Sequence, residues 1–473
     1  MKNKKIIGKR LAVVFVSAVT LFTGCLVQPA EVQAKKNAWP KGPEINAPNA
    51  VVMEVNTGTV LYKKKEHERH YPASITKILT TLLTIENCDL NEIITFSADA
   101  VYKNEGDTSN IARDLNEEMT VEQTLYGVML ESANECAYAA AEHVGQKLGG
   151  DYRTFIDLMN KKAKELGCTD THFNNSNGLP DEEHWTSAYD MALISCEAYR
   201  NEQFRTITGT PNYQIPPTNK HSDVTYLNNH HNILHFFNTG KYINEYCTGG
   251  KTGYTRVANS TLVTYAEKDG LVLCVVIMNA NSPDHWTDTN KLIDYCFSNY
   301  QALNISEHEA SIAESNRLSK GILNTYGDFV TLDEEAYIVL PNTAEFKDAN
   351  FERDDEVDDK NTIAALKYTY GGREVGNVEI VAANATVEDL YYSQAGTERA
   401  EGKDNVITIK PEVLIVGGIS AAFLLTMLLV IKYVYDNFYF IRHNREVKRA
   451  ERERFKTVRV RKRRRGWKNR LFK

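Results

Sequence analysis

The stretch Tyr71-Pro72-Ala73-Ser74-Ile75-Thr76-Lys77 places a serine and a lysine three residues apart at the start of a predicted helix. Proline is tolerated at a helix start, and residues 78–83 continue an apolar helical period. Ser74 is therefore expected in the first turn, where the helix dipole favours developing negative charge. Lys77 shares its helix face, and a lysine whose pKa is lowered by burial and nearby cations can take the serine proton. Ser74 and Lys77 are thus a candidate nucleophile and base.

A second polar motif, Ser132-Ala133-Asn134, lies between two helical patterns. A loop that joins two helices presents polar side chains into a cleft. In such a cleft Ser132 can relay a proton toward a leaving amine, and Asn134 can bind a substrate amide. Both residues are therefore candidate catalytic residues.

The third motif, Lys251-Thr252-Gly253, precedes a predicted β-hairpin and is expected on an edge strand. Lys251 and Thr252 can hold a carboxylate by charge and hydrogen bond, and Gly253 lets a peptide backbone approach and pair as an added strand. We expect the backbone N–H groups of Ser74 and Tyr254 to form an oxyanion hole.

Taken alone, each motif also fits ordinary helix capping or a surface turn. Their occurrence together and in order favours one catalytic cleft. No metal and no cofactor is expected, because the histidines, including His230, His231 and His235, show no H-E-x-x-H pattern.

The two ends of the chain predict export and membrane attachment. Residues 1–34 combine a basic start, an apolar stretch and a small-residue cleavage site, the layout of a signal peptide. Thr23-Gly24-Cys25 leaves lipidation at Cys25 as an alternative. Residues 413–431 carry no charge and are long enough, about 28 Å as a helix, to form a transmembrane helix.

Charge is distributed unevenly along the chain. The tail at residues 432–473 has 17 Lys or Arg residues and four acidic residues, whereas the chain as a whole has a net charge of −7. Basic residues next to a span stay in the cytoplasm, which predicts a single-pass protein of the bacterial cell membrane with an extracytoplasmic body. Anionic lipid is the expected partner of this tail, in preference to nucleic acid.

Between the ends, the pattern predicts two domains. Residues 45–300 combine a hairpin at 50–62, helical periodicity over 74–167, a second hairpin at 259–278 and a helix at 290–300, which fits an α/β (α+β) domain. Residues 305–390 contain short strands near 328–332, 336–340, 364–370 and 375–382 and predict a small all-β domain, most simply a sandwich. Residues 391–411 are a predicted linker.

Seven of the eight cysteines follow the predicted signal peptide, are widely scattered and include no C-x-x-C pair. This pattern indicates neither a dense disulfide scaffold nor a zinc ribbon. We expect buried thiols such as Cys274 and leave a single isolated disulfide open.

The three motifs and their surroundings resemble the low-molecular-weight penicillin-binding proteins, the serine-type D-alanyl-D-alanine carboxypeptidases (peptidase S11-like). The resemblance covers roughly residues 46–300. It includes Thr57-Gly58-Thr59-Val60-Leu61-Tyr62, Met159-Asn160-Lys161-Lys162-Ala163, residues 173–179 and Thr186-Ser187-Ala188-Tyr189-Asp190-Met191. It implies a serine β-lactamase/transpeptidase-like catalytic fold.

The implied reaction removes the terminal D-alanine of a peptidoglycan stem peptide through a Ser74 acyl-enzyme, with β-lactams acylating the same serine. Three departures affect the substrate side: Glu135 stands where aspartate is usual, Ala258-Asn259-Ser260 replaces an alanine-glycine pair, and His285-Trp286 replaces a frequent arginine-phenylalanine.

Three rival functions remain open at this stage. A DD-endopeptidase acting on cross-links would use the same residues. A class A-like β-lactamase shares the motifs but needs a further glutamate, for which no convincing equivalent is present. An inactive wall-binding scaffold is the third, and retention of every motif residue argues against it.

Overall fold

The computed structural model describes residues 39–103, 108–308, 330–354 and 362–382. The predicted signal peptide, linker, transmembrane helix and basic tail all lie outside these residues. Within the described ranges, none of the helices combines the length and apolar character that crossing a bilayer requires.

The first half of the described chain is mostly helical. Its elements are β1 (Asn49–Glu54), β2 (Val60–Lys64), the 3-10 turn η1 (Ala73–Thr76), α2 (Lys77–Asn87), β3 (Ile93–Thr95), α3 (Ala98–Tyr102), β4 (Glu118–Thr120), α4 (Val121–Met129), α5 (Asn134–Lys147), α6 (Tyr152–Glu165), α7 (Ala188–Arg200) and α8 (Glu202–Gly209).

The second half is mostly strand. Its elements are β5 (Asn212–Ile215), β6 (Thr225–Asn228), β7 (Cys247–Thr255), β8 (Asn259–Lys268), β9 (Leu271–Ala280), α9 (Asp284–Asn299), β10 (Tyr300–Asn304), β11 (Val330–Leu332), β12 (Tyr337–Pro341), the 3-10 turn η3 (Phe346–Asp348), β13 (Asn350–Asp354), β14 (Thr362–Tyr370) and β15 (Arg373–Ala382).

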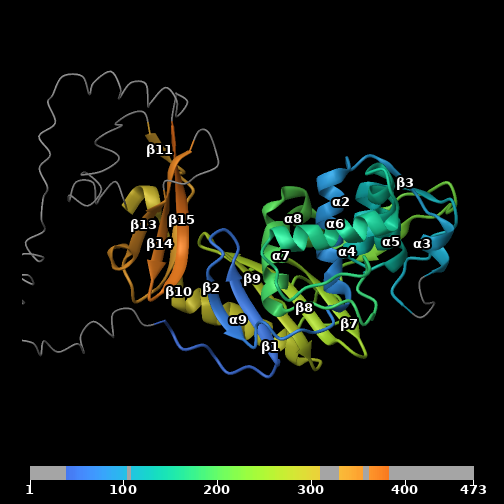
Figure 1. Ribbon diagram of the computed structural model, residues 1–473. Coiled ribbons are helices and arrows are strands. Elements are labelled where there is room, and N and C mark those ends of the chain that lie inside the picture. The colour runs from blue at the N-terminus through green and yellow to red at the C-terminus, as the bar shows by residue number, and fades with distance from the viewer. Residues whose placement is uncertain (1–38, 104–107, 309–329, 355–361, 383–473) are drawn as a thin grey trace, which may run out of the picture. The chain divides into compact units, whose positions relative to one another are not determined.

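The centre of the first domain is an antiparallel sheet in the order β2-β1-β9-β8-β7. Helix α7 packs on one face, and α9 packs on the other (Figure 1). Successive residues of β1 enter different cores: Val51 joins the core beneath α7, and Val52 joins the core beneath α9. Because side chains alternate along a strand and both faces are covered, β1, β8 and β9 are apolar on both faces.

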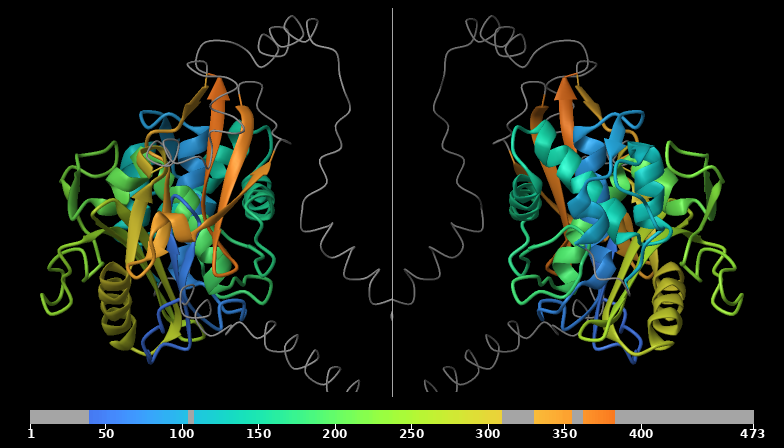
Figure 2. Two further views of the ribbon diagram at one scale, coloured as in Figure 1. Left: turned by 90° about the vertical axis from the view of Figure 1, so that its left-hand side faces the viewer. Right: turned by 90° about the vertical axis from the view of Figure 1, so that its right-hand side faces the viewer.

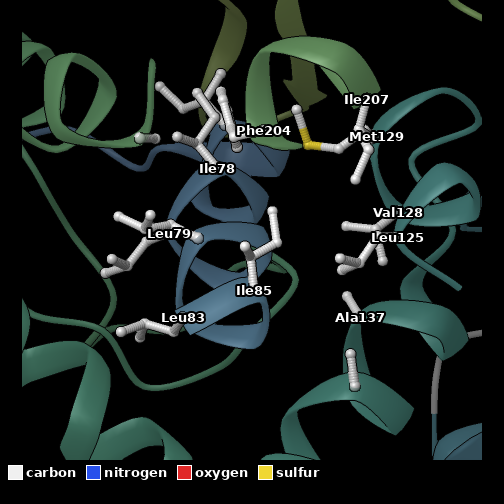
Figure 3. Close-up of a cluster of buried hydrophobic side chains, with 14 of the residues drawn as sticks. Ile78, Leu79, Leu83, Ile85, Leu125, Val128, Met129, Ala137, Phe204 and Ile207 are labelled. Atoms are coloured by element: carbon white, nitrogen blue, oxygen red, sulfur yellow. The ribbon is translucent and has the colours of Figure 1, made fainter. Parts of the chain in front are cut away.

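Helix α2 passes through the larger core. Figure 3 shows Ile78, Leu79, Leu83 and Ile85 projecting from α2, with Leu125 and Val128 of α4 on the side of Ile85. Nine of its eleven residues are buried, Lys77 among them. The helix that follows the candidate nucleophile is therefore surrounded by protein, which fixes the position of its first turn.

The two predicted hairpins are confirmed as β1–β2 and β8–β9. The predicted helical character over 74–167 is interrupted by β3 and β4, a pair of three-residue strands that the sequence pattern did not indicate. The last helix also begins earlier than predicted. It starts directly after Pro283, a residue that tolerates a helix start, and runs over 284–299.

The described segment that follows α9 is mostly β, the character predicted for residues 305–390, apart from a helical turn at 305–308 and η3, and its described strands form two sheets. β10 pairs with β12, and the second sheet has the order β11-β15-β14-β13 (Figures 1 and 2). Ile338 and Leu340 of β12 share a buried cluster with Leu366 and Tyr368 of β14. Two sheets around one core are the arrangement expected of a small sandwich. Strand β13 was not predicted.

All seven cysteines within the described residues are free, and six of them are buried. Cys274 in β9 belongs to the core beneath α7, as its apolar surroundings indicated. The isolated disulfide that the sequence left open is therefore not formed among these residues.

Candidate active site

Ser74 lies in η1, the tight turn that leads into α2. The residue before it, Ala73, has φ of 52°, in the left-handed region that costs a non-glycine residue free energy. Two contacts fix this turn. The Thr261 hydroxyl donates to the Pro72 carbonyl at 2.8 Å, and Gly178 lies so close that a Cβ there would be 1.9 Å from the Ala73 carbonyl oxygen. The nucleophile turn is thus held by β8 and by the loop containing Gly178.

The Lys77 amine is the centre of the polar cluster. Its Nζ lies 3.1 Å from Ser74 Oγ, 2.7 Å from Asn134 Oδ1 and 2.6 Å from the Asn177 carbonyl oxygen. The side chain is fully buried. Burial, reinforced by the charge of Lys251, lowers the pKa of Lys77 well below its ordinary value. A neutral amine beside the serine hydroxyl is the state that a general base requires.

The second motif sits where α4 ends and α5 begins. Asn134 is the first residue of α5, and its backbone N–H donates to the Ser109 carbonyl at 2.9 Å. Ser132 has φ of 60° and is buried. Among the described residues its Oγ has no hydrogen-bond partner. The structure therefore brings Asn134 into contact with Lys77 and leaves the Ser132 hydroxyl buried and unpaired.

Lys251 lies on β7, the edge strand of the central sheet, as predicted for the third motif. Its side chain is buried, and Nζ donates to the Thr252 carbonyl at 3.0 Å. Burial lowers the pKa of Lys251 to about 7, against the opposing influence of the Glu131 carboxylate. Lys251 is therefore a cation that loses its charge near neutral pH, and while it is charged it contributes to the lowered pKa of Lys77.

Gly253 is where β7 meets the nucleophile turn. A Cβ at this position would lie 2.8 Å from the Ser74 backbone nitrogen and 2.3 Å from Thr261 Oγ1, so only glycine fits. The Ser74 N–H therefore lies next to β7 at Gly253, the residue that precedes Tyr254. The backbone N–H groups of Ser74 and Tyr254 are the two groups proposed for the oxyanion hole.

A cavity of about 520 Å³ opens beside the nucleophile. Its lining includes Ser74 and Asn134, Thr108 and Ser109, and Tyr254 and Thr255 of β7 with the turn that follows. The side chain of Tyr254 is 68% exposed, so it borders the opening. Of the predicted site residues, Ser74, Asn134 and Tyr254 line this cavity. Lys77 contacts Ser74 and Asn134, and the buried Lys251 and Gly253 precede Tyr254 on β7.

A family profile described as D-alanyl-D-alanine carboxypeptidase (Peptidase S11) matches residues 34–282. The chain belongs to this family.

Named relatives agree with that assignment. The chain is 35% identical over 274 residues to D-alanyl-D-alanine carboxypeptidase DacF of Bacillus subtilis, a match that covers 57% of this chain and 66% of DacF, just under two thirds of its length. It is 28% identical to the D-alanyl-D-alanine carboxypeptidase of Streptomyces sp. strain K15, covering 60% of this chain and 98% of that protein. The crystal structure of the Streptomyces K15 DD-transpeptidase aligns with a TM-score of 0.49 at 27% identity, over 55% of this chain and 100% of that one.

Two departures from the usual S11 sequence now have structural explanations. Glu135, in place of aspartate, is buried and accepts a hydrogen bond from the Ile111 backbone N–H at 2.6 Å, which ties the 108–111 wall to α5. Burial raises the pKa of the Glu135 carboxyl group. His285, in place of arginine, is buried, and burial lowers its pKa to about 4, so it offers no positive charge at neutral pH.

Several residues of this S11 site were not singled out from the sequence. Asn177 contributes only a backbone carbonyl, and Glu131 acts on Lys251 through charge, so neither belongs to a motif. His231 is buried against β7 and β8, with Nε2 3.0 Å from Thr264 Oγ1, and burial lowers its pKa to about 3. His230 Nε2 lies 2.9 Å from a Glu131 carboxylate oxygen, so both histidines make structural contacts around the site.

One group outside the S11 site offers metal-ligating atoms within the described ranges: Cys88, Glu92 and His143. The Lys147 ammonium already pairs with Glu92 at 2.5 Å. The cluster is therefore explained as an ion pair between α5 and the loop that follows α2.

Proposed function

We propose that this chain is a serine DD-carboxypeptidase that removes the terminal D-alanine from peptidoglycan stem peptides. The observation that carries the proposal is the contact between Ser74 Oγ and the buried Lys77 Nζ at 3.1 Å, at the base of an open cavity. Membership of the D-alanyl-D-alanine carboxypeptidase family supports this choice of substrate.

The hydrogen bonds of Lys77 determine the direction of proton transfer. A neutral amine has two N–H groups and one lone pair. Asn134 Oδ1 and the Asn177 carbonyl are acceptors, and they take the two N–H groups. The lone pair is then directed at Ser74 Oγ, whose hydroxyl can donate. Ser74 can therefore attack the carbonyl between the last two D-alanines while its proton passes to Lys77.

The tetrahedral intermediate would be stabilised by the backbone N–H groups of Ser74 and Tyr254. On collapse, the C–N bond breaks, the leaving D-alanine amine takes a proton, and Ser74 becomes acylated. The Ser132 hydroxyl, buried and without a partner among the described residues, can relay that proton from Lys77. Water then hydrolyses the ester and regenerates Ser74.

Lys251 and Thr252 would bind the terminal carboxylate of the substrate. Lys251 is close enough to lower the pKa of Lys77, so a carboxylate placed between β7 and Ser74 would meet its charge directly. β-Lactams carry the same carboxylate beside a strained amide, and the proposal therefore includes acylation of Ser74 by penicillin.

The test is release of D-alanine from a peptide ending in D-Ala-D-Ala by the full chain, compared with Ser74→Ala. We expect the variant to lose at least about 10³-fold in kcat/KM, because it lacks the nucleophile. Ser298→Ala, at an exposed position of α9, is the matched control and should retain activity.

The rival functions predict different outcomes. Penicillin labelling of Ser74 without D-alanine release, but with cleavage of cross-linked dimers, would assign the endopeptidase. Rapid penicillin turnover would assign a β-lactamase. If the folded protein is not labelled by penicillin and releases no D-alanine, the enzyme proposal is contradicted and the wall-binding scaffold remains.

We also propose that residues 413–431 anchor the protein in the cell membrane, with the catalytic domain outside and the basic tail on anionic lipid inside. The uncharged span and the 17 basic residues that follow it support this orientation. Protease added to intact spheroplasts should remove the catalytic domain and spare a tag at the C-terminus. Loss of that tag would contradict the orientation.

A further inference from the structure

The turn between β7 and β8 places one cation at the cavity. Arg256 is the first residue of this turn, which joins Thr255 to Asn259. The Ala258 N–H donates to Thr255 Oγ1 at 3.0 Å, and Asn259 has φ of 54°. Three-residue hairpin loops closed by a left-handed residue are a standard, well-defined geometry. The backbone that carries Arg256 is therefore fixed relative to β7.

Arg256 differs from its neighbours in charge. Of the described residues that line the cavity, it is the one whose side chain is charged. It is exposed, and no carboxylate within the described part of the chain forms an ion pair with it. Residues 11–431 have a net charge of −25. A cation that has no ion-pair partner and borders the cavity is therefore opposite in sign to the net charge of this part of the chain.

The direction of β7 determines which part of a substrate would meet this cation. In the proposed function, on which this inference rests, the terminal carboxylate lies at Lys251 and Thr252, and the scissile carbonyl lies at the Tyr254 N–H. A peptide added to the free edge of β7 advances about 3.3 Å per residue, at the same rate as the strand itself. Beyond Tyr254, the chain on the acyl side of the scissile bond would reach Thr255 and Arg256.

We propose that Arg256 is a specificity residue that binds a carboxylate on the side chain of the residue preceding D-Ala-D-Ala. A guanidinium forms paired, charge-assisted hydrogen bonds with a carboxylate and has no comparable interaction with an amide or an ammonium group. Leu179, Pro180 and Val257 line the same cavity and offer an apolar wall for the aliphatic part of that side chain. The substrate class is thus a stem peptide whose third residue carries a free, unamidated carboxylate.

The test compares three peptides, N-acetyl-X-D-Ala-D-Ala, in which X is L-2-aminoadipate, its ω-amide or L-lysine. We expect the full-length protein to process the carboxylate peptide with a kcat/KM about tenfold higher than the amide peptide, and higher still than the lysine peptide. In Arg256→Gln the preference for carboxylate over amide should fall to about one. Lys161→Gln, which removes an exposed positive charge from α6, should keep the preference.

Penicillin labelling measured in parallel separates failure of this inference from failure of the proposed function. Equal labelling of parent and Arg256→Gln would show that the variant is folded with a competent Ser74. Equal rates on all three peptides in the parent, or an unchanged preference in Arg256→Gln, would overturn the role of Arg256 and leave the carboxypeptidase intact. Absence of D-alanine release from every peptide would instead contradict the proposed function itself.

Discussion

At the scale of single residues, the two buried lysines carry out different tasks because their surroundings differ. Lys77 has only neutral acceptors around its amine, and its pKa lies well below the ordinary value. Lys251 is influenced by the Glu131 carboxylate, and its pKa is about 7. The lowered pKa favours the neutral, proton-accepting form of Lys77, while Lys251 can still be charged and attract a carboxylate.

This difference predicts the alkaline limb of the pH profile. If the charged form of Lys251 binds the substrate carboxylate, kcat/KM should fall as pH rises through about 7, because the free enzyme loses that charge. Glu131→Gln removes the carboxylate that raises the pKa of Lys251, so the limb should move to lower pH. Glu165→Gln, an exposed position on α6, should leave it in place. A limb unchanged in Glu131→Gln would contradict the assignment to Lys251.

The residues predicted from the sequence are those whose chemistry is local. Ser74 and Lys77 are three residues apart on one turn, so the periodicity of a helix was enough to pair them. The partners that complete the site are distant: Asn177 lies 100 residues beyond Lys77. Every residue has a carbonyl group, so no side-chain pattern could have identified this one. The unpaired state of the Ser132 hydroxyl also depends on packing and was not predictable.

At the scale of elements, β7 and η1 form one unit although about 170 residues separate them in the chain. Strands β7 and β8 both pack against the nucleophile turn. Sequence patterns predicted the two hairpins, because alternating apolar residues around a short turn are a strong signal. They missed β3, β4, β5 and β6, since strands of three or four residues are too short for a period to be recognised.

The close approach of β7 to η1 predicts the effect of adding one methyl group. In Gly253→Ala the new Cβ would have to displace Thr261 Oγ1 or the Ser74 N–H. Because that N–H is an oxyanion donor in the proposed mechanism, we expect kcat/KM to fall about 10²-fold, with acylation by penicillin slowed as well. Gly240→Ala, whose Cβ would approach no atom closer than 3.4 Å, is the control. Full activity in folded Gly253→Ala would contradict this account of the site.

At the scale of the whole molecule, the sequence indicated a change to short strands near residue 300, but it did not indicate the pairing across this boundary. β10 follows α9 directly and pairs with β12, which lies beyond residues 309–329. Trp39, near the start of the described chain, packs against Tyr300 and Tyr370 from the two sides of this boundary. Such contacts join residues hundreds of positions apart, so composition and periodicity carry no signal for them. Apolar alternation, by contrast, predicted β14 and β15 because it is local.

Several bases are buried in the folded protein, and burial favours their uncharged form. Burial lowers the pKa of His184 and of His231 to about 3, and that of Lys251 to about 7. For each group the folded pKa is depressed, so its contribution is full above the unfolded pKa and declines as pH falls below it. The two histidines reduce the free energy of unfolding as pH falls below about 6.5. Lys251 reduces it as pH falls from about 10.5 to about 7.

We therefore expect the free energy of unfolding to rise from pH 5.5 to pH 8.5. Between pH 7 and 5.5 each histidine should cost about 1 kcal/mol, and between pH 7 and 8.5 the release of the Lys251 proton should add about 1.5 kcal/mol. Urea unfolding followed by tryptophan fluorescence at fixed ionic strength measures both intervals. Lys251→Met retains the apolar stem without the amine, so it should be more stable than the parent at pH 7 and lose the part of the rise that Lys251 contributes, while Lys77 keeps its own part. A parent stability that is flat or falls over pH 7 to 8.5 would contradict the lowered pKa of both buried lysines.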